Sequence, residues 1–98
     1  MKYNKTDNGK AMTVELIGEV DSMNVTEIEE TLLKETGGVT DLTFDLSQLE
    51  YISSAGLRVL LQMQKTMKSQ GNMYIKNVNE DVMEIFKVTW FVRLLNIV

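Results

Sequence analysis

Histidine and cysteine are both absent from this chain of 98 residues. Without cysteine there is no disulfide, no thiolate nucleophile and no cysteine-built zinc or iron–sulfur site. Without histidine the chain lacks the side chain most used for proton transfer near neutral pH, which excludes Ser-His-Asp triads and imidazole-ligated metals. These absences argue against most enzyme classes, and we expect no cofactor and no metal site.

Charge and hydropathy exclude further classes of function. The chain has 10 Lys and Arg against 14 Asp and Glu, a net charge of −4, whereas nucleic acids require a basic surface. The sequence does not begin with the basic and then apolar segments of a secretory signal peptide. Apolar runs such as Val59-Leu60-Leu61 are too short to span a bilayer. We therefore expect a cytoplasmic binding or regulatory domain without a nucleic acid partner and without direct membrane insertion.

Proline is the third residue type that is missing, and no Ser- or Gly-rich stretch or internal repeat marks a linker. With 98 residues, of which 44% are apolar, the chain can bury one hydrophobic core but is too short to build two. We predict a single domain over residues 1–98.

Turn residues and hydrophobic periodicity predict the elements of the first half. Asp7-Asn8-Gly9 is typical of a hairpin turn, because Asn and Gly tolerate positive φ. Apolar residues alternate over positions 12–20, which predicts a strand with one buried face. Asn24 and Glu27 have the spacing of an N-cap and its reciprocal partner, and they open a helix predicted from Val25 to Thr36.

The second half shows the same alternation of strand and helix patterns. A strand is predicted over positions 42–46, followed by a loop from Gln48 to Ser53 and a helix from about Ser54 to Gly71. Three further elements complete the chain, namely a strand from Met73 to Val78, a short helix capped by Asn79 and a closing strand from Arg93 to Val98.

The predicted order of elements, β-β-α-β-α-β-α-β, determines the fold class. Strands separated by helices need right-handed crossovers and form a largely parallel sheet. A parallel sheet covered on both faces has continuous apolar strands, whereas these strands alternate. We therefore predict an α/β fold, a mostly parallel mixed sheet with helices mainly on one face. The other face is open to water or covered by a partner, and it carries Thr13, Glu15, Thr43 and Asp45.

The inward positions of these elements predict one shared core. Its predicted members are Leu16, Phe44, Leu46, Leu57, Leu60, Ile75, Ile85 and Phe86. The methionines at positions 63, 67, 73 and 83 are interpreted as core filling, and Trp90 with Phe91 as an apolar lid over the core.

One segment, from Asp45 to Leu57, is chemically unusual, because a strand leads through a loop to paired serines at the start of a helix. In one interpretation Ser54 is the N-cap, whose hydroxyl accepts a hydrogen bond from a backbone N–H two or three residues on. In the other, the free N–H groups and positive dipole of the helix start tolerate a phosphate on that hydroxyl. A phosphate adds a charge of about −1.5 to −2, which repels an acidic partner or removes a close contact.

The sequence resembles the bacterial anti-sigma factor antagonists, whose fold is called the STAS domain, over essentially its whole length. Three segments carry the resemblance, namely Leu16-Ile-Gly-Glu-Val-Asp21, Asp45-Leu-Ser and Tyr51-Ile-Ser-Ser-Ala-Gly-Leu57. In that family the first residue of a small Ser-Ser-Gly or Ser-Thr-Gly triplet is phosphorylated by a kinase that is itself the anti-sigma factor. The resemblance implies phosphorylation at Ser54. Many members have Asp just before that serine, whereas this chain has Ser53, a second candidate acceptor.

The resemblance also implies a partner surface. The turn at Asp21 would lie beside the phosphorylated serine, although an Asp before a helix is also commonly a cap. The residues expected to contact the partner are Asp21, Ser53, Ser54, Ala55, Gly56 and Arg58. Such a protein sequesters an anti-sigma serine kinase while it is unphosphorylated, is switched off by serine phosphorylation and is restored by a serine phosphatase.

Two other function classes remain as alternatives. One is a non-catalytic cytoplasmic STAS subunit of a lipid or anion transport complex, in which Ser54 would only cap the helix. The other is an enzyme with Ser54 as nucleophile. The enzyme would lack a histidine base and the glycine two positions before the serine that a nucleophile elbow requires. We therefore expect no enzymatic activity.

Overall fold

The chain begins with a β-hairpin whose turn depends on residues that accept positive φ. In the computed structural model, which describes residues 1–98, Asn8 has a φ of 57° and Gly9 a φ of 85°. On either side of this turn, β1 (Lys2–Thr6) and β2 (Ala11–Glu15) pair in antiparallel fashion. The predicted hairpin is thus confirmed.

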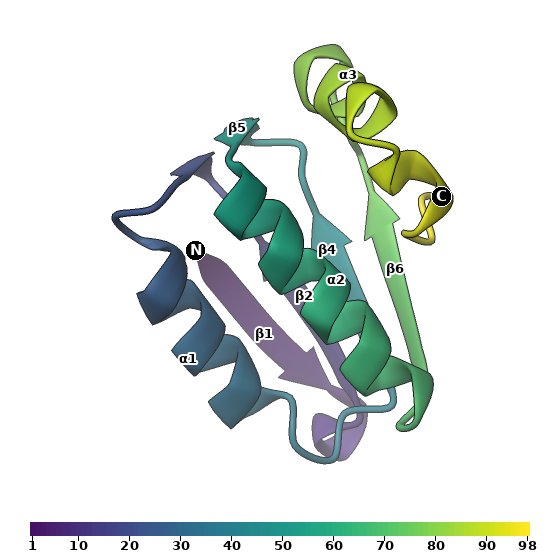
Figure 1. Cartoon of the computed structure of the whole chain (residues 1–98). Helices are drawn as coiled ribbons and strands as arrows, with labels where there is room; N and C mark the ends of the chain where they lie inside the picture. The colour runs from purple at the N-terminus through teal and green to yellow at the C-terminus, as the bar shows by residue number, and fades with distance from the viewer.

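The main sheet has four strands in the order β1-β2-β4-β6 (Figure 1). Strands β4 (Asp41–Asp45) and β6 (Asn72–Lys76) join β2 in parallel, so only the N-terminal hairpin is antiparallel. Along β2, β4 and β6, buried residues alternate with partly buried or exposed ones. The predicted mostly parallel mixed sheet is confirmed.

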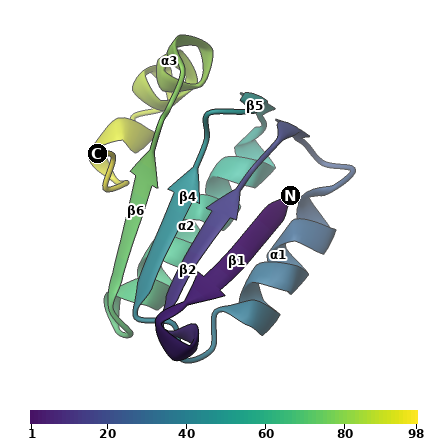
Figure 2. The same ribbon diagram turned by 180° about the vertical axis from the view of Figure 1, so that it is seen from behind.

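The two longer helices cover one face of this sheet. Helix α1 (Val25–Glu35) and helix α2 (Ser54–Lys68) pack on the same side, and the shorter α3 (Glu80–Val88) packs beside β5 (Leu49–Ile52) at one end (Figure 1). Figure 2 shows the opposite face without a helix over it, as predicted. None of the helices, the longest of which has 15 residues, is long and apolar enough to cross a membrane.

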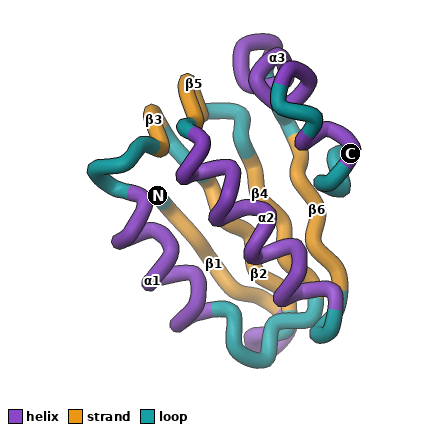
Figure 3. Tube along the Cα trace, in the orientation of Figure 1, coloured by secondary structure: helices purple, strands orange, loops and turns teal.

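The strand predicted over positions 12–20 is two strands that belong to different sheets. After β2 the chain leaves the main sheet, and β3 (Gly18–Val20) pairs in parallel with β5 as a separate two-stranded sheet (Figure 3). The break lies at Leu16 and Ile17, and Gly18, with a φ of 75° and an irregular register after it, begins the new strand. Residues 49–52, expected to be a loop, are therefore a strand, and that prediction was wrong.

The C-terminal segment differs most from the prediction. Instead of a strand over residues 93–98, the chain forms a short 3₁₀ helix, η2 (Phe91–Arg93), and meets the sheet edge at an isolated bridge between Ile97 and Ile75. Trp90 has a left-handed φ of 67°, which turns the chain, and the residue is 60% exposed, with the Arg93 guanidinium carbon 4.8 Å from the centre of its ring. Trp90 is therefore not a lid over the core, although Phe91 is partly buried against it.

One hydrophobic core of 21 buried residues lies between the helices and the sheet. All the predicted core members except one are fully buried, and Ile85 is partly buried against the same cluster. The methionines at 63, 67 and 73 are buried, and Met83 is partly buried, which confirms their interpretation as core filling.

Phe44, on the inner face of β4, tests this core, because it is completely buried. Truncation by Phe44→Ala is expected to lower the free energy of unfolding by about 3–5 kcal/mol, through lost apolar burial and the cavity that remains. The neighbouring Thr43→Ala, on the open face, is the control and should cost less than about 1 kcal/mol. Urea denaturation measures both, and equal losses would contradict the inward register of β4.

Gly56 tests the close packing of α2 on the small sheet. A Cβ at this position would lie 2.6 Å from Ile52 Cγ1 and 2.8 Å from Val20 Cγ1. Gly56→Ala is therefore expected to destabilise the protein, since overpacking costs about 1–3 kcal/mol and the gain in helix propensity is at most about 1 kcal/mol. Gly37→Ala is the control, because a Cβ there meets nothing within 4 Å. Thermal unfolding that ranks Gly56→Ala as the more stable variant would refute this packing.

Candidate functional site

The pairing of β3 with β5 brings together the two segments that the sequence motifs singled out. Val20 and Ile52 are partners in the parallel register, so Asp21 and Ser53 both follow directly at the same end of the small sheet. The Ser53 N–H donates to the Val20 carbonyl at 2.8 Å, which extends the pairing by one residue. The Asp21 turn and the start of α2 therefore lie side by side (Figure 3).

The first turn of α2 has its N-cap at Ser53, one residue before the predicted position. The backbone of Ser53 is extended, its carbonyl accepts the first helical bond from Leu57 N at 2.9 Å, and its Oγ accepts from Gly56 N at 3.2 Å. Ser54 is instead the first residue inside the helix and is exposed. The interpretation of Ser54 as the cap was wrong, and its hydroxyl is not used for capping.

The small residues after Ser54 have different roles. Gly56 is buried against the side chains of Ile52 and Val20, so it lets the helix approach the small sheet and lies beneath the surface. Ala55 is partly buried. Arg58 is exposed one turn further along α2, and residues four apart on a helix are neighbours on its surface. Ser54 and Arg58 are therefore presented on one side of the helix.

The turn that contains Asp21 is held by its own side chains. The Asp21 carboxylate accepts from the backbone N–H groups of Met23 at 2.9 Å and Asn24 at 3.3 Å. In return, the Asn24 amide oxygen accepts from Asp21 N at 3.0 Å, and its Nδ2 donates to the Glu19 carbonyl at 2.8 Å. The predicted capping pair of Asn24 and Glu27 is wrong, because the Asn24 side chain points back into this turn and does not cap α1.

Asp45 in the Asp45-Leu-Ser segment performs a comparable structural task at the end of β4. Its carboxylate accepts from the Ser47 N–H at 3.0 Å, which turns the chain from β4 toward β5. This backbone hydrogen bond is the main reason why the pKa of Asp45 lies below its ordinary value, with the nearby Lys76 charge a weaker cause. Asp45 is therefore held as a carboxylate that stabilises the turn.

The two segments that form the site are poor in basic residues. The sequence has no Lys or Arg between Lys34 and Arg58, and none between Lys10 and Lys34. Arg58 is therefore the basic residue nearest to Ser54 along the sequence.

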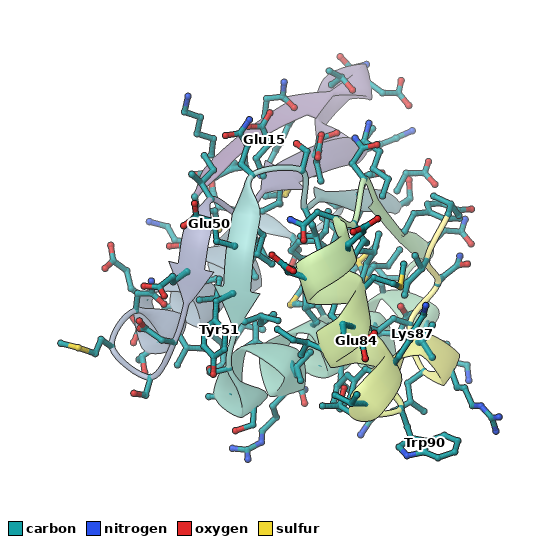
Figure 4. All side chains as sticks on the ribbon, turned by 90° about the horizontal axis from the view of Figure 1, so that it is seen from above. Glu15, Glu50, Tyr51, Glu84, Lys87 and Trp90 are labelled. Atoms are coloured by element: carbon teal, nitrogen blue, oxygen red, sulfur yellow. The ribbon has the colours of Figure 1, made fainter.

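Sequence reasoning missed two features of this surface. One is β5, which pairs exposed Tyr51 with exposed Glu19 across the small sheet; Figure 4 labels Tyr51 on that strand. The other is the exposed Met23 in the Asp21 turn. The apolar residues at positions 49 and 52 are the only sequence indication of β5. Because two polar or exposed residues separate them, they lack the period-two alternation that predicts a strand.

Comparisons with known proteins give a consistent result. The family model of the STAS domain matches residues 2–98. Over 81 residues the chain is 35% identical to a protein of Bordetella bronchiseptica named "Putative anti-sigma factor antagonist BtrV", and the match covers 81% of this chain and 70% of that protein.

Two solved structures of one anti-sigma factor antagonist, SpoIIAA of Bacillus, share the fold at 16% identity. The unphosphorylated form matches with a TM-score of 0.81 over 99% of this chain and 88% of that chain. The phosphorylated form matches with a TM-score of 0.73 over 99% of this chain and 91% of that chain. From the family match and the identity to the Bordetella protein, the chain belongs to the anti-sigma factor antagonist family of STAS domains.

Proposed function

We propose that this chain is a single-domain switch that binds and sequesters an anti-sigma serine kinase in the bacterial cytoplasm while Ser54 is unphosphorylated. Phosphorylation of Ser54 by that kinase ends binding, and a serine phosphatase restores it. The chain acts by binding and not by catalysis. The observation that carries the proposal is the position of Ser54, which is exposed, inside the first turn of α2 and free of capping.

The two serines differ in how available their hydroxyls are. Ser53 is partly buried, and its Oγ accepts the hydrogen bond from Gly56 N, so modification there would remove a cap worth about 0.5–2 kcal/mol. Ser54 is exposed and has no such task. A phosphate on Ser54 would also meet the positive end of the α2 dipole, which favours negative charge in the first turn. We therefore assign phosphorylation to Ser54 and expect the backbone to stay as it is.

Loss of binding follows from where the new charge would lie. A kinase that transfers phosphate from ATP to Ser54 holds the nucleotide phosphates next to that hydroxyl. A phosphoserine with a charge of about −1.5 to −2 then faces like charges at close range. Two unit charges 4 Å apart interact with about 1 kcal/mol in water and about 4 kcal/mol near a protein surface. Repulsion of this size changes affinity by between about fivefold and about a thousandfold.

The neighbouring residues complete the proposed contact surface. Asp21 and Ser53 lie at the end of the small sheet, and Ala55 is small enough to leave space beside Ser54. Arg58 offers a cation one turn away from Ser54. Gly56 supports this surface from below, because it is buried against Val20 and Ile52. The existence of SpoIIAA, which has the same fold, in unphosphorylated and phosphorylated forms supports a switch that leaves the fold intact.

The acceptor can be mapped with purified anti-sigma kinases from the source organism. The kinase that modifies the wild-type chain with ATP is expected to add one phosphate, located at Ser54 by peptide mass spectrometry. Ser54→Ala should remain unmodified and still bind the kinase, because removing the hydroxyl leaves the surface intact. Ser53→Ala is the matched control and should still be modified at Ser54. Stoichiometric phosphorylation of Ser54→Ala at Ser53 would show that the assignment is wrong.

The electrostatic part of the switch is tested by comparing Ser54→Asp with Ser54→Asn. The two side chains have nearly the same size, so a difference in kinase affinity isolates the charge. Ser54→Asp is expected to bind at least tenfold more weakly than Ser54→Asn in calorimetry with the nucleotide-loaded kinase. Both should show the circular dichroism of the wild type, since an Asp in the first turn of a helix is well tolerated. Equal affinities would mean that charge does not operate the switch.

A further inference from the structure

Met23 is an apolar side chain held in solvent by a rigid turn. It is 92% exposed, more than any other large hydrophobic residue of the chain. Its own N–H is bound by the Asp21 carboxylate at 2.9 Å, and the hydrogen bonds between Asp21, Asn24 and Glu19 fix the backbone on both sides. Little backbone entropy is therefore lost when such a side chain enters a partner's pocket, which is the advantage of a preorganised contact.

The position of Met23 connects it to the proposed switch. It follows Asp21 by two residues, and the β3–β5 register places that turn beside Ser53 and the start of α2. Tyr51, which is 46% exposed, lies further back on the same small sheet as the cross-strand partner of Glu19. Trp90, which is also exposed, lies well apart from Tyr51 (Figure 4). Met23 thus lies on the turn that adjoins the Ser54 surface.

The charge of the segment around Met23 indicates the kind of surface that fits it. Between Ala11 and Leu33 the chain has six acidic residues and no Lys or Arg. Glu19 is exposed, and Asp21 is partly exposed in the turn itself. An apolar centre with a polar rim is the usual build of an energetically important contact. A complementary surface therefore has an apolar pocket bordered by basic side chains.

We infer that Met23 is an apolar anchor of the kinase-binding surface and inserts into a pocket of the anti-sigma kinase that is lined by apolar and bordered by basic side chains. The inference rests on the proposed function and adds a second contact point to it. Attraction and repulsion act at different places in this arrangement. The acidic rim meets the basic border of the pocket, whereas a phosphate on Ser54 meets the phosphates of the nucleotide.

The experiment measures the affinity of Met23→Ala for the kinase that modifies the wild-type chain. Met23→Ala is expected to bind about tenfold more weakly or worse, because truncation removes a buried anchor, and to melt at the wild-type temperature. Leu33→Ala is the matched control, since Leu33 is 52% exposed near the other end of α1 and should keep its affinity within about twofold. Ser54→Asp is measured in parallel.

Each outcome of this comparison has one meaning. Wild-type affinity of Met23→Ala beside weakened Ser54→Asp would overturn the anchor and leave the switch standing. If Met23→Ala is weakened while Ser54→Asp binds like wild type, the anchor stands and the switch fails. If no anti-sigma kinase of the organism binds the wild-type chain, both fail. Dissociation of a wild-type dimer by Met23→Ala, seen by sedimentation without kinase, would overturn the inference in favour of a contact between two copies.

Glu19→Gln tests the basic border of the pocket separately. Neutralising one rim charge is expected to slow association with the kinase about two- to tenfold at low salt and to reduce the salt dependence of that rate. Lys65→Gln, on the exposed side of α2 two turns beyond Arg58, is a control for a general charge effect and should not slow association. Faster association of Glu19→Gln would show that the partner surface is acidic, contrary to the inference.

Discussion

The parallel pairing of β3 with β5 is the contact on which the arrangement of this surface depends. It joins segments that lie far apart in the sequence and places the residues after Val20 and Ile52 next to each other. The start of α2 is locked to the same pair by the hydrogen bond from Ser53 N and by the close approach at Gly56. The position of the Ser54 hydroxyl therefore follows from a small sheet that lies outside the main one.

Most polar side chains of the motifs stabilise backbone turns. Asp21 holds the turn before α1, Asp45 the turn after β4, and Ser53 the first turn of α2. Asn79 continues this pattern, because its amide binds the Leu49 carbonyl at 2.5 Å while its oxygen caps α3. Each of these groups satisfies backbone atoms that strands and helices leave free at their ends. The hydroxyl of Ser54 has no such task, and a chemical switch can use it without cost to the fold.

The acidity of the chain has a specific consequence for such a switch. On a surface that is already negative, one added phosphate weakens partner binding strongly only if the partner has its own negative charge at the same point. In the switch that we propose, a nucleotide-bearing kinase does so at Ser54, while the acidic residues around Met23 stay available for basic groups of the partner. The proposal thus assigns affinity and switching to different residues, affinity to Met23 and switching to Ser54.

Local patterns in the sequence determined the elements whose residues interact with near neighbours or alternate over a long stretch. The hairpin at Asn8-Gly9, the strand around Phe44 and the helix capped by Asn79 follow from turn chemistry and periodicity alone. The motifs also pointed to the paired serines and, through the family resemblance, to Ser54. Tertiary structure decided the rest, because a three-residue strand and a four-residue strand are stable only when each finds the other. The same pairing determines where the backbone becomes helical, and so which serine is the cap and which is free.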